Sequence, residues 1–204
     1  MELKETEMQH RILEKARELF FFFGVKSITM DDISKHLGIS KKTLYTFYKD
    51  KGELVRLVMG DLLSKHTEET LKIKEKAQNS IEEVALQAQI LYTVFKEVKP
   101  NVFFEVEKYF PDLAGQFSDH RYSCMLEGIK ENLERGKAEE LYREDLDVAF
   151  TAQVRLNQLI SAFDEKAYES VEFNIRQIIN KLTLFYLNAI CSTEGKQLIA
   201  KYLK

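Results

Sequence analysis

The sequence predicts an all-α protein. Only 2 prolines and 8 glycines occur in 204 residues, so few breaks separate long helix-compatible stretches. Apolar side chains recur three and four positions apart through most of the chain, which is typical of amphipathic helices. No stretch alternates convincingly between apolar and polar residues, as a half-exposed strand would. The 45% apolar and 31% charged residues are ordinary for a folded globular protein.

The first helix is expected near residues 12–23. Its apolar side chains recur at helical spacing, and Gly24 follows as a C-terminal stop. These apolar positions are Ile12, Ala16, Leu19, Phe20 and Phe23.

Two short helices and one long helix should follow. Thr29 is a suitable N-cap for a helix over residues 30–37, because its hydroxyl can accept a hydrogen bond from a free backbone amide. Ser40 can cap a third helix of about two turns in the same way. Asp50 then precedes a helix expected over residues 51–76, roughly 40 Å long at 1.5 Å per residue.

The rest of the chain also divides into helices. Asn79 and Ser80 provide a cap, and Pro100 and Pro111 suit first helical positions. A polar loop is expected around Gly136, and Thr193 should cap the last helix. The longer predicted helices cover about residues 80–98, 101–110, 111–135, 146–163 and 170–191.

Several classes of protein are disfavoured by composition. Cys124 and Cys191 are far apart and lie in no CxxC pattern, and the four histidines show no metal-binding spacing such as HExxH. We therefore expect no metal and no cofactor. No stretch of about 18 apolar residues occurs, and the N-terminal residues are too polar for a signal peptide. A cytoplasmic protein is the expectation.

Positive charge is concentrated in one short segment, although the net charge is −3. Residues 1–52 hold ten Lys or Arg and eight Asp or Glu, while the remainder is acidic. Between Lys35 and Lys51, five lysines accompany the single acidic residue Asp50. This distribution favours a local nucleic-acid contact rather than a protein that coats nucleic acid.

The segment 29–54 has the pattern of a helix-turn-helix. Two short helices flank Gly38, which permits the left-handed backbone of the turn, and the second helix opens with Ser40 and a lysine pair. Such a motif places its second helix in the major groove of DNA. The alternative is an ordinary helical hairpin with a solvated lysine face.

The second helix of this motif should bury one side and present the other. Leu44 and Tyr48, four residues apart, would face a small core, so the lysine, threonine and tyrosine side chains can reach phosphates or base edges. The amides that follow Thr29 can also meet a phosphate. The predicted DNA-contacting residues are Thr29, Ser40, Lys41, Lys42, Thr43, Tyr45, Thr46, Lys49 and Lys51.

The same region resembles the N-terminal domain of the tetracycline-repressor (TetR) family of transcriptional regulators. The matching residues are Ala16, Leu19-Phe20, Gly24, Thr29-Met30, Ile33, Leu37-Gly38-Ile39-Ser40, Thr43-Leu44-Tyr45, Tyr48, Lys51 and Leu54. Two positions depart from the family pattern: Phe47 stands where His or Tyr is frequent, and Ser34 replaces a usual Ala.

The resemblance implies a homodimeric, ligand-responsive regulator, usually a repressor. It assigns a phosphate contact to Thr29, base-edge or phosphate contacts to Lys41, Lys42 and Thr43, and backbone contacts to Tyr45 and Lys51. The implied domains are a helix-turn-helix DNA-binding domain over residues 1–50 and a helical effector-binding and dimerisation domain over residues 51–204.

An effector site in the larger domain is implied by the resemblance alone. Aromatic and polar side chains there are candidates for it, although aromatics at helical spacing also form ordinary core. The candidates are Tyr92, Phe95, Phe103, Phe104, Phe110, Gln116, Phe117, His120 and Asn157. Since no cationic trap for an acid is evident, we expect an apolar or cationic effector.

The last two long helices carry apolar residues on more than one side, so each must be buried twice. They are either central helices of a monomer or, as the resemblance implies, a four-helix dimer interface. A two-fold dimer would space its recognition helices about 34 Å apart and would read a palindromic operator.

Two other functions compete with this interpretation. An enzyme is disfavoured because Ser123 and Cys124, with His120 one turn earlier, lack an orienting acid and an oxyanion loop. A helical adaptor that uses its basic segment to bind protein is the second alternative.

Overall fold

The structure is a computed structural model that describes residues 2–203, apart from the side chains of residues 2–4, 100, 121 and 165. The all-α prediction is confirmed, because 79% of the chain is helical and the described residues form no strand. One isolated antiparallel bridge joins Tyr142 to Cys191. No helix of the described chain is long and apolar enough to cross a membrane.

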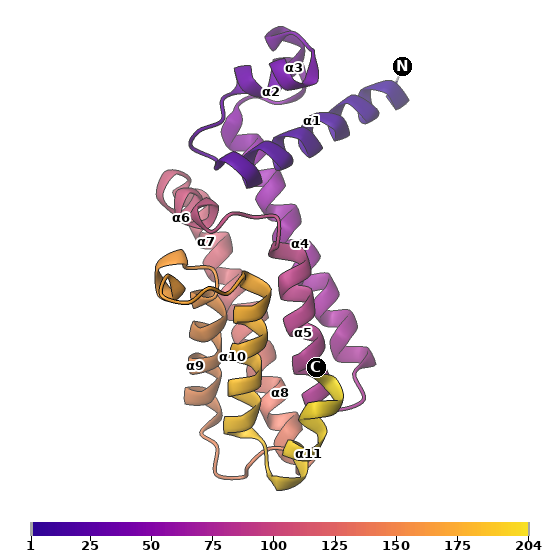
Figure 1. Ribbon diagram of the computed structural model, residues 1–204. Helices are drawn as coiled ribbons and strands as arrows, with labels where there is room; N and C mark the ends of the chain where they lie inside the picture. Colours follow the sequence, from indigo (N-terminus) through magenta and orange to yellow (C-terminus); the bar gives the residue numbers. More distant parts are fainter. Residues whose placement is uncertain (1, 204) are drawn as a thin grey trace. The chain divides into compact units, whose positions relative to one another are not determined.

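Eleven α-helices follow one another along the described chain (Figure 1). Two short segments of other helical types interrupt them: a π-helix over His120–Leu126 and a 3₁₀-helix over Glu165–Tyr168. The α-helices are α1 (Glu2–Phe23), α2 (Met30–Leu37), α3 (Lys41–Phe47), α4 (Lys51–Lys76), α5 (Ser80–Phe95), α6 (Pro100–Tyr109), α7 (Pro111–Asp119), α8 (Glu127–Ala138), α9 (Val148–Ser161), α10 (Ile175–Ile190) and α11 (Thr193–Tyr202).

The chain forms two compact units. The N-terminal unit comprises Met1–Ser64 and Glu97–Phe117, and the C-terminal unit comprises Lys65–Lys96 and Ser118–Lys204. The change from one unit to the other falls inside α4. The division into domains at residue 50 that the sequence suggests stays a prediction.

The helices α1, α2 and α3 share a core in the N-terminal unit. Phe20 of α1, Ile33 of α2 and Leu44 of α3 are completely buried, and α2 packs against both α1 and α3. Phe23, expected on the same apolar side of α1, is instead about half exposed. It is the last residue of the helix, and the left-handed Gly24 (φ 86°) turns the chain away immediately after it.

The expected caps hold the two helices of the motif in place. Thr29 and Asp32 form a reciprocal capping box, in which each side chain accepts a hydrogen bond from the other residue's backbone amide. Gly38 ends α2 in the left-handed conformation with φ 68°. Ser40 then accepts a hydrogen bond from the Thr43 amide and starts α3. The turn geometry therefore follows from residues that the sequence already marks.

The C-terminal unit is a helical bundle in which α8, α9 and α10 lie side by side (Figure 1). Its core joins side chains from five helices, together with Tyr142 from the loop after α8. The fully buried members of this core include Ile81, Leu133 and Leu187. Here each helix covers the apolar face of its neighbours, as amphipathic helices require.

Several helix ends differ from the sequence-based expectation. The helix α5 stops at Phe95 rather than near Val98, and α10 begins at Ile175, where Asn174 forms a capping box with Gln177. Ser192, not Thr193, caps α11, because its hydroxyl oxygen accepts the hydrogen bond from the Gly195 amide.

The helix α8 continues through Gly136, where the sequence suggested a loop. A Cβ atom at this position would lie 2.0 Å from the Tyr142 ring. That ring is buried, and its hydroxyl donates a hydrogen bond to Asn132 at 3.0 Å. Gly136 is therefore required for the close packing of Tyr142 on α8 and not for a turn.

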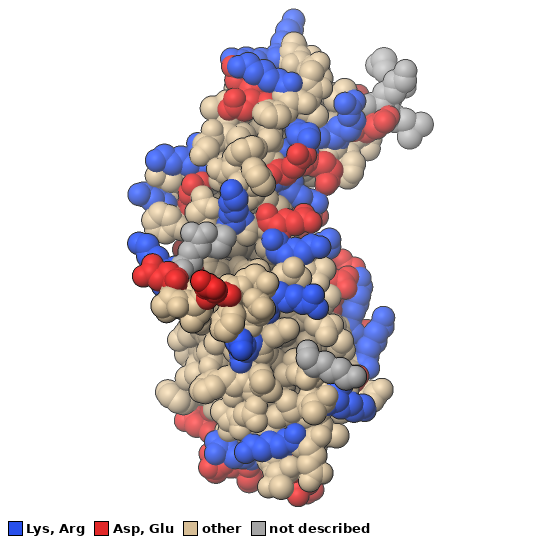
Figure 2. Space-filling model, in the orientation of Figure 1, with Lys and Arg blue, Asp and Glu red and all other residues tan. Residues whose placement is uncertain are grey.

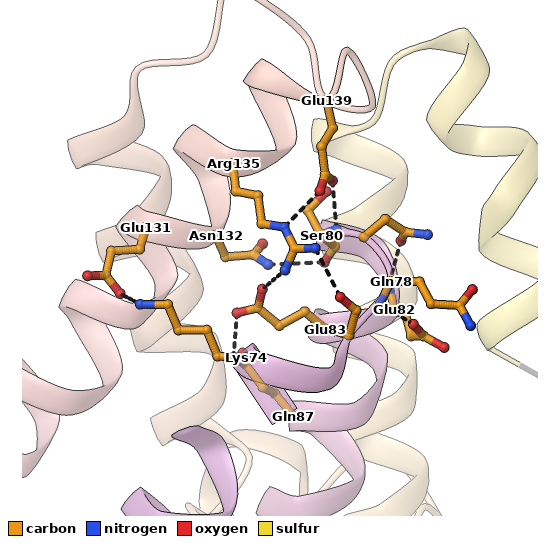
Figure 3. A network of polar contacts seen from close by, with 12 residues as sticks. Lys74, Gln78, Ser80, Glu82, Glu83, Gln87, Glu131, Asn132, Arg135 and Glu139 are labelled. Carbon is orange, nitrogen blue, oxygen red and sulfur yellow. Dashed lines mark hydrogen bonds and ion pairs between the residues drawn. The ribbon is translucent and has the colours of Figure 1, made fainter. Parts of the chain in front are cut away.

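A polar network ties α5 to α8 inside the C-terminal unit (Figure 3). The guanidinium of Arg135 lies 3.2 Å from the buried carboxylate of Glu83 and 2.7 Å from that of Glu139. Glu139 also accepts a hydrogen bond from the backbone amide of Ser80, and Asn132 donates to the Ser80 carbonyl. The network thus gives hydrogen-bond partners to the backbone amide and carbonyl of the buried Ser80 at the start of α5.

Substitution of Gly136 by alanine should destabilise the protein. The added methyl group must displace the anchored Tyr142 ring, and we expect the free energy of unfolding to fall by about 3 kcal/mol. Urea unfolding followed by circular dichroism measures this change. Gly128→Ala is the matched control on the same helix: its Cβ meets nothing within 4 Å, so stability should stay equal or rise by up to about 1 kcal/mol.

Glu83 should give the stability of the protein a distinct pH dependence. Burial raises the pKa of Glu83 above its ordinary value, although Arg135 and Asn132 oppose the shift. The folded state therefore holds this proton more tightly than the unfolded chain, so the contribution of Glu83 to stability falls as pH rises above the ordinary glutamate value.

Urea unfolding of the wild type and Glu83→Gln between about pH 4 and pH 8 tests this sign. The variant should become more stable relative to the wild type as pH rises through that window. Glu131→Gln, which removes an exposed carboxylate from α8, serves as the control. An opposite slope would contradict the assignment.

Candidate functional site

The helix α3 presents polar side chains on the side away from its buried residue. Leu44 is completely buried, whereas Lys41, Lys42, Tyr45 and Thr46 are exposed. The exposed fraction of the Tyr45 side chain is 51%. These four of the predicted residues are thus exposed on α3, and Lys49, just beyond the helix, is exposed as well.

The lysines of this surface differ in their partners. Lys41 lies 3.1 Å from Asp31 of α2, and its ammonium holds the pKa of the Asp31 carboxyl below its ordinary value. Lys42 forms no ion pair with any residue that the structure describes. Figure 2 shows basic side chains over α2 and α3, with acidic ones between them. Lys42 is therefore the α3 lysine best available for an external anion.

Lys51 is held more tightly than the sequence suggested. Its ammonium donates hydrogen bonds to the carbonyl oxygens of Val25 and Ile28, both at 3.0 Å, and burial lowers the pKa of Lys51. It fixes the loop between α1 and α2 to the start of α4. Two of its three N–H donors are thus used within the fold, and one remains for a phosphate.

The hydroxyl groups of the two cap residues are also engaged. The Thr29 hydroxyl donates to the Asp32 carboxylate at 2.6 Å, and the Ser40 and Thr43 hydroxyls lie 2.9 Å apart. Thr46 donates to the Thr43 carbonyl. These residues hold the helix starts, where free backbone amides remain to bind an anion.

A small cavity of about 50 Å³ lies inside the C-terminal unit. Much of its wall is apolar, from Val84, Ala88, Leu91, Ile129 and Leu159. The polar part of the wall includes Arg155, Tyr186, Asn132, Gln87, Thr70 and His66, and no Asp or Glu lies among the described lining residues.

None of the nine sequence-predicted effector residues lines this cavity. Five belong to the N-terminal unit: Phe103, Phe104, Phe110, Gln116 and Phe117. In the C-terminal unit, Phe95 and His120 contact His66, which does line the cavity. Tyr92 lies beneath the Arg176 guanidinium, and the exposed Asn157 accepts a hydrogen bond from Gln153. The sequence-predicted effector residues therefore stay a prediction, separate from this cavity.

The cavity contains a buried cation that the sequence analysis missed. Arg155 is only 3% exposed, its Nη2 atom donates to the Thr183 hydroxyl at 2.9 Å, and its guanidinium lies 4.6 Å from the Tyr186 ring centre. Burial lowers the pKa of Arg155 to about 10, so the side chain remains charged at neutral pH. A lone arginine within the otherwise uncharged helix VAFTAQVRLNQLIS was the available sequence signal.

Two histidines and a cysteine meet beside the cavity. The His66 Nδ1 and His120 Nε2 atoms lie 3.1 Å apart, and the ligand atoms of His66, His120 and Cys124 all lie within 4.8 Å of one another. Burial lowers the pKa of His66 to about 3 and of His120 to about 4, so both rings are neutral at pH 7. Such a set could hold an ion of the zinc type. Sequence spacing could not reveal this set, because His66 and His120 are 54 residues apart along the chain.

Comparisons with known proteins support the assignment of the N-terminal segment. Residues 12–58 match the family model described as bacterial regulatory proteins, tetR family. The uncharacterized HTH-type transcriptional regulator YhgD of Bacillus subtilis is 38% identical over 71 residues, 35% of this chain and 34% of that protein. The regulator TtgR of Pseudomonas putida is 27% identical over 97 residues, 48% of this chain and 44% of that protein. The chain thus matches less than half the length of these relatives.

Solved structures extend the similarity to nearly the whole fold. A TetR-family transcriptional regulator from Marinobacter aquaeolei VT8 has a TM-score of 0.78 at 16% identity, over 96% of this chain and 98% of that one. A transcriptional regulator from Saccharomonospora viridis in complex with choline also has a TM-score of 0.78, at 15% identity, over 92% and 99%. Residues 12–58, with the cap residues of α2 and α3, thus resemble the tetR family of bacterial regulatory proteins, and the chain has the fold of these solved regulators.

Proposed function

We propose that this protein is a transcriptional regulator that binds a palindromic DNA operator as a homodimer and releases it when a small molecule binds. The observation that carries the proposal is the exposed basic face of α3 within a segment that matches the tetR family. Repression is the favoured direction of regulation, because the family resemblance implies it.

In the proposed DNA contact, α3 enters the major groove. Lys42 and Tyr45 project from the face opposite Leu44, which anchors the helix in its core. Lysines reach guanine acceptors or phosphates, and a tyrosine hydroxyl reaches a phosphate oxygen. The backbone amides at the capped N-terminus of α2 can donate to a phosphate of the DNA.

A second copy of the chain is the partner that the exposed apolar surface of α9 and α10 fits. Phe150 and Val154 of α9 and Leu184 and Phe185 of α10 are exposed, with 69% and 67% for the two phenylalanines. Figure 2 shows a broad uncharged surface over these helices. Large apolar patches on soluble proteins mark interaction sites. A four-helix interface formed by two copies would bury them.

Effector release follows from linkage between two states of the dimer. In one state the two recognition helices are spaced to fit successive major grooves, and in the other they are not. A ligand that binds more tightly to the second state lowers the fraction of dimers that can bind DNA. A coupling of about 1–3 kcal/mol would change operator affinity roughly 5–150-fold. The choline complex of the relative from Saccharomonospora viridis supports a small-molecule effector as a class. The cavity in the C-terminal unit is the proposed place for it.

Lys42→Ala and Tyr45→Ala should each weaken DNA binding. Operator sites are first selected from random duplexes with the purified protein, and a palindromic consensus is expected. Affinity is then measured by fluorescence anisotropy at several salt concentrations. For Lys42→Ala we expect roughly a tenfold loss and a salt slope that is smaller by about 0.9 per dimer half-site.

Lys196→Ala is the matched control for this experiment. Lys196 is an exposed lysine of α11, so its loss removes the same charge from the C-terminal unit. Its affinity should stay close to that of the wild type. Unchanged binding by both Lys42→Ala and Tyr45→Ala would show that another surface contacts DNA, and would favour the adaptor alternative if no duplex were bound at all.

Phe185→Glu should separate the proposed dimer. A buried carboxylate at an apolar interface is strongly unfavourable, so sedimentation velocity should show a monomer at concentrations where the wild type is dimeric. Phe104→Glu is the control, because Phe104 is exposed to a similar extent (64%) on α6 of the N-terminal unit. If Phe185→Glu left the sedimentation coefficient unchanged, this surface would not be the interface.

A further inference from the structure

Arg155 is a buried cation without an anionic partner. One nitrogen of its guanidinium, Nη2, donates to the Thr183 hydroxyl, whereas Nη1 is buried and has no hydrogen-bond partner. No carboxylate of the described chain forms an ion pair with it. Leaving a buried charge unpaired costs several kcal/mol in general, so an anion that completes this guanidinium would bind favourably.

A second unsatisfied group points to the same ligand. The Tyr186 hydroxyl is also buried without a hydrogen-bond partner, and both Tyr186 and Arg155 line the cavity. A guanidinium N–H and a phenol O–H are both donors, and a carboxylate offers two acceptor oxygens. Two free donors at one cavity therefore indicate an oxyanion rather than a cation.

The remaining walls indicate what the anion carries. Val84, Ala88 and Leu91 from α5 face the cavity with Ile129 and Leu159, so an alkyl group would meet apolar side chains. One water-sized occupant needs about 10–15 Å³ of this kind of volume. The 50 Å³ cavity therefore has room for roughly four non-hydrogen atoms.

We infer that the cavity of the C-terminal unit binds the carboxylate of a short aliphatic acid, with Arg155 and Tyr186 as donors. The inference deepens the proposed function by giving the effector a chemical class, and it replaces the expectation of an apolar or cationic effector. It rests on the proposed function only in calling this ligand an effector, because the binding itself requires no DNA.

The competing interpretation makes Arg155 purely structural, held by Thr183 and by its contact with the Tyr186 ring. The two interpretations differ in what the removal of the charge does to the empty protein. A structural arginine would stabilise it, whereas an arginine that awaits an anion destabilises it, since replacing an unpaired buried charge by an apolar side chain relieves the desolvation cost.

The first experiment measures binding to the full chain without DNA. Sodium acetate, propionate and butyrate are compared with the matching neutral amides by thermal unfolding and isothermal titration calorimetry. Sodium chloride and phosphate at the same ionic strength control for a nonspecific anion. We expect the carboxylates to raise the unfolding temperature, most strongly for the acid that fills the cavity, and the amides to have little effect.

Variants identify the residues responsible. Arg155→Met should weaken carboxylate binding by on the order of 100-fold, and Tyr186→Phe by about tenfold, from the loss of charge-assisted and single hydrogen bonds. Tyr122→Phe, which removes the hydroxyl of an exposed tyrosine outside the cavity lining, should bind like the wild type. Unliganded Arg155→Met should unfold at the same temperature as the wild type or higher.

Three results would overturn the inference. Equal stabilisation by acids and amides, or by chloride and phosphate, would exclude a carboxylate site. Undiminished carboxylate binding by both Arg155→Met and Tyr186→Phe would place the site elsewhere. A less stable Arg155→Met, together with no carboxylate binding by the wild type or Tyr186→Phe, would establish the structural role. Failure to bind any duplex would contradict the proposed function and leave this result intact.

Discussion

The burial of Leu44 under α3 is the interaction on which the exposed basic surface depends. A helix of seven residues is too short to be stable alone in water. Its first turn is held by the Ser40 cap, and its apolar side is held by the core around Phe20 and Ile33. Because one side of the helix is fixed inside, Lys42 and Tyr45 are fixed outside. The position of these two side chains is thus a consequence of packing, and their own chemistry does not stabilise it.

Two buried charged side chains of the C-terminal unit, Glu83 and Arg155, have different kinds of partner. Glu83 is almost completely buried but lies beside Arg135, and Glu139 of the same network accepts a hydrogen bond from the Ser80 amide at the start of α5. Arg155 is equally buried but lies beside a hydroxyl and an aromatic ring, with no acid. A paired buried charge fixes the arrangement of its helices, whereas an unpaired one leaves a binding requirement unmet. This contrast within one bundle is why we propose the cavity, rather than the network, as the place for a ligand.

Much of the helical architecture could be predicted because local sequence signals decide it. The caps at Thr29 and Ser40 and the left-handed Gly38 depend on a few neighbouring residues, so the motif is recognisable before any packing is known. The cavity was not predictable in this way. Aromatic side chains such as Phe103 and Phe117 were the sequence-based candidates, but these two rings contact each other within the N-terminal unit. Apolar periodicity identifies a buried face and cannot distinguish a core contact from a ligand contact.

By itself, the sequence determined that the chain is all-α, where most helices begin, and that a short lysine-bearing helix follows a glycine turn. These features are set by hydrogen bonds and steric limits within one or two helical turns. Only the tertiary structure decided that Gly136 serves packing, that Lys51 is bonded to the loop before α2, and that Arg155 lies beside Tyr186. Each of these depends on which helices become neighbours, and long-range burial, unlike capping, leaves no fixed spacing in the sequence.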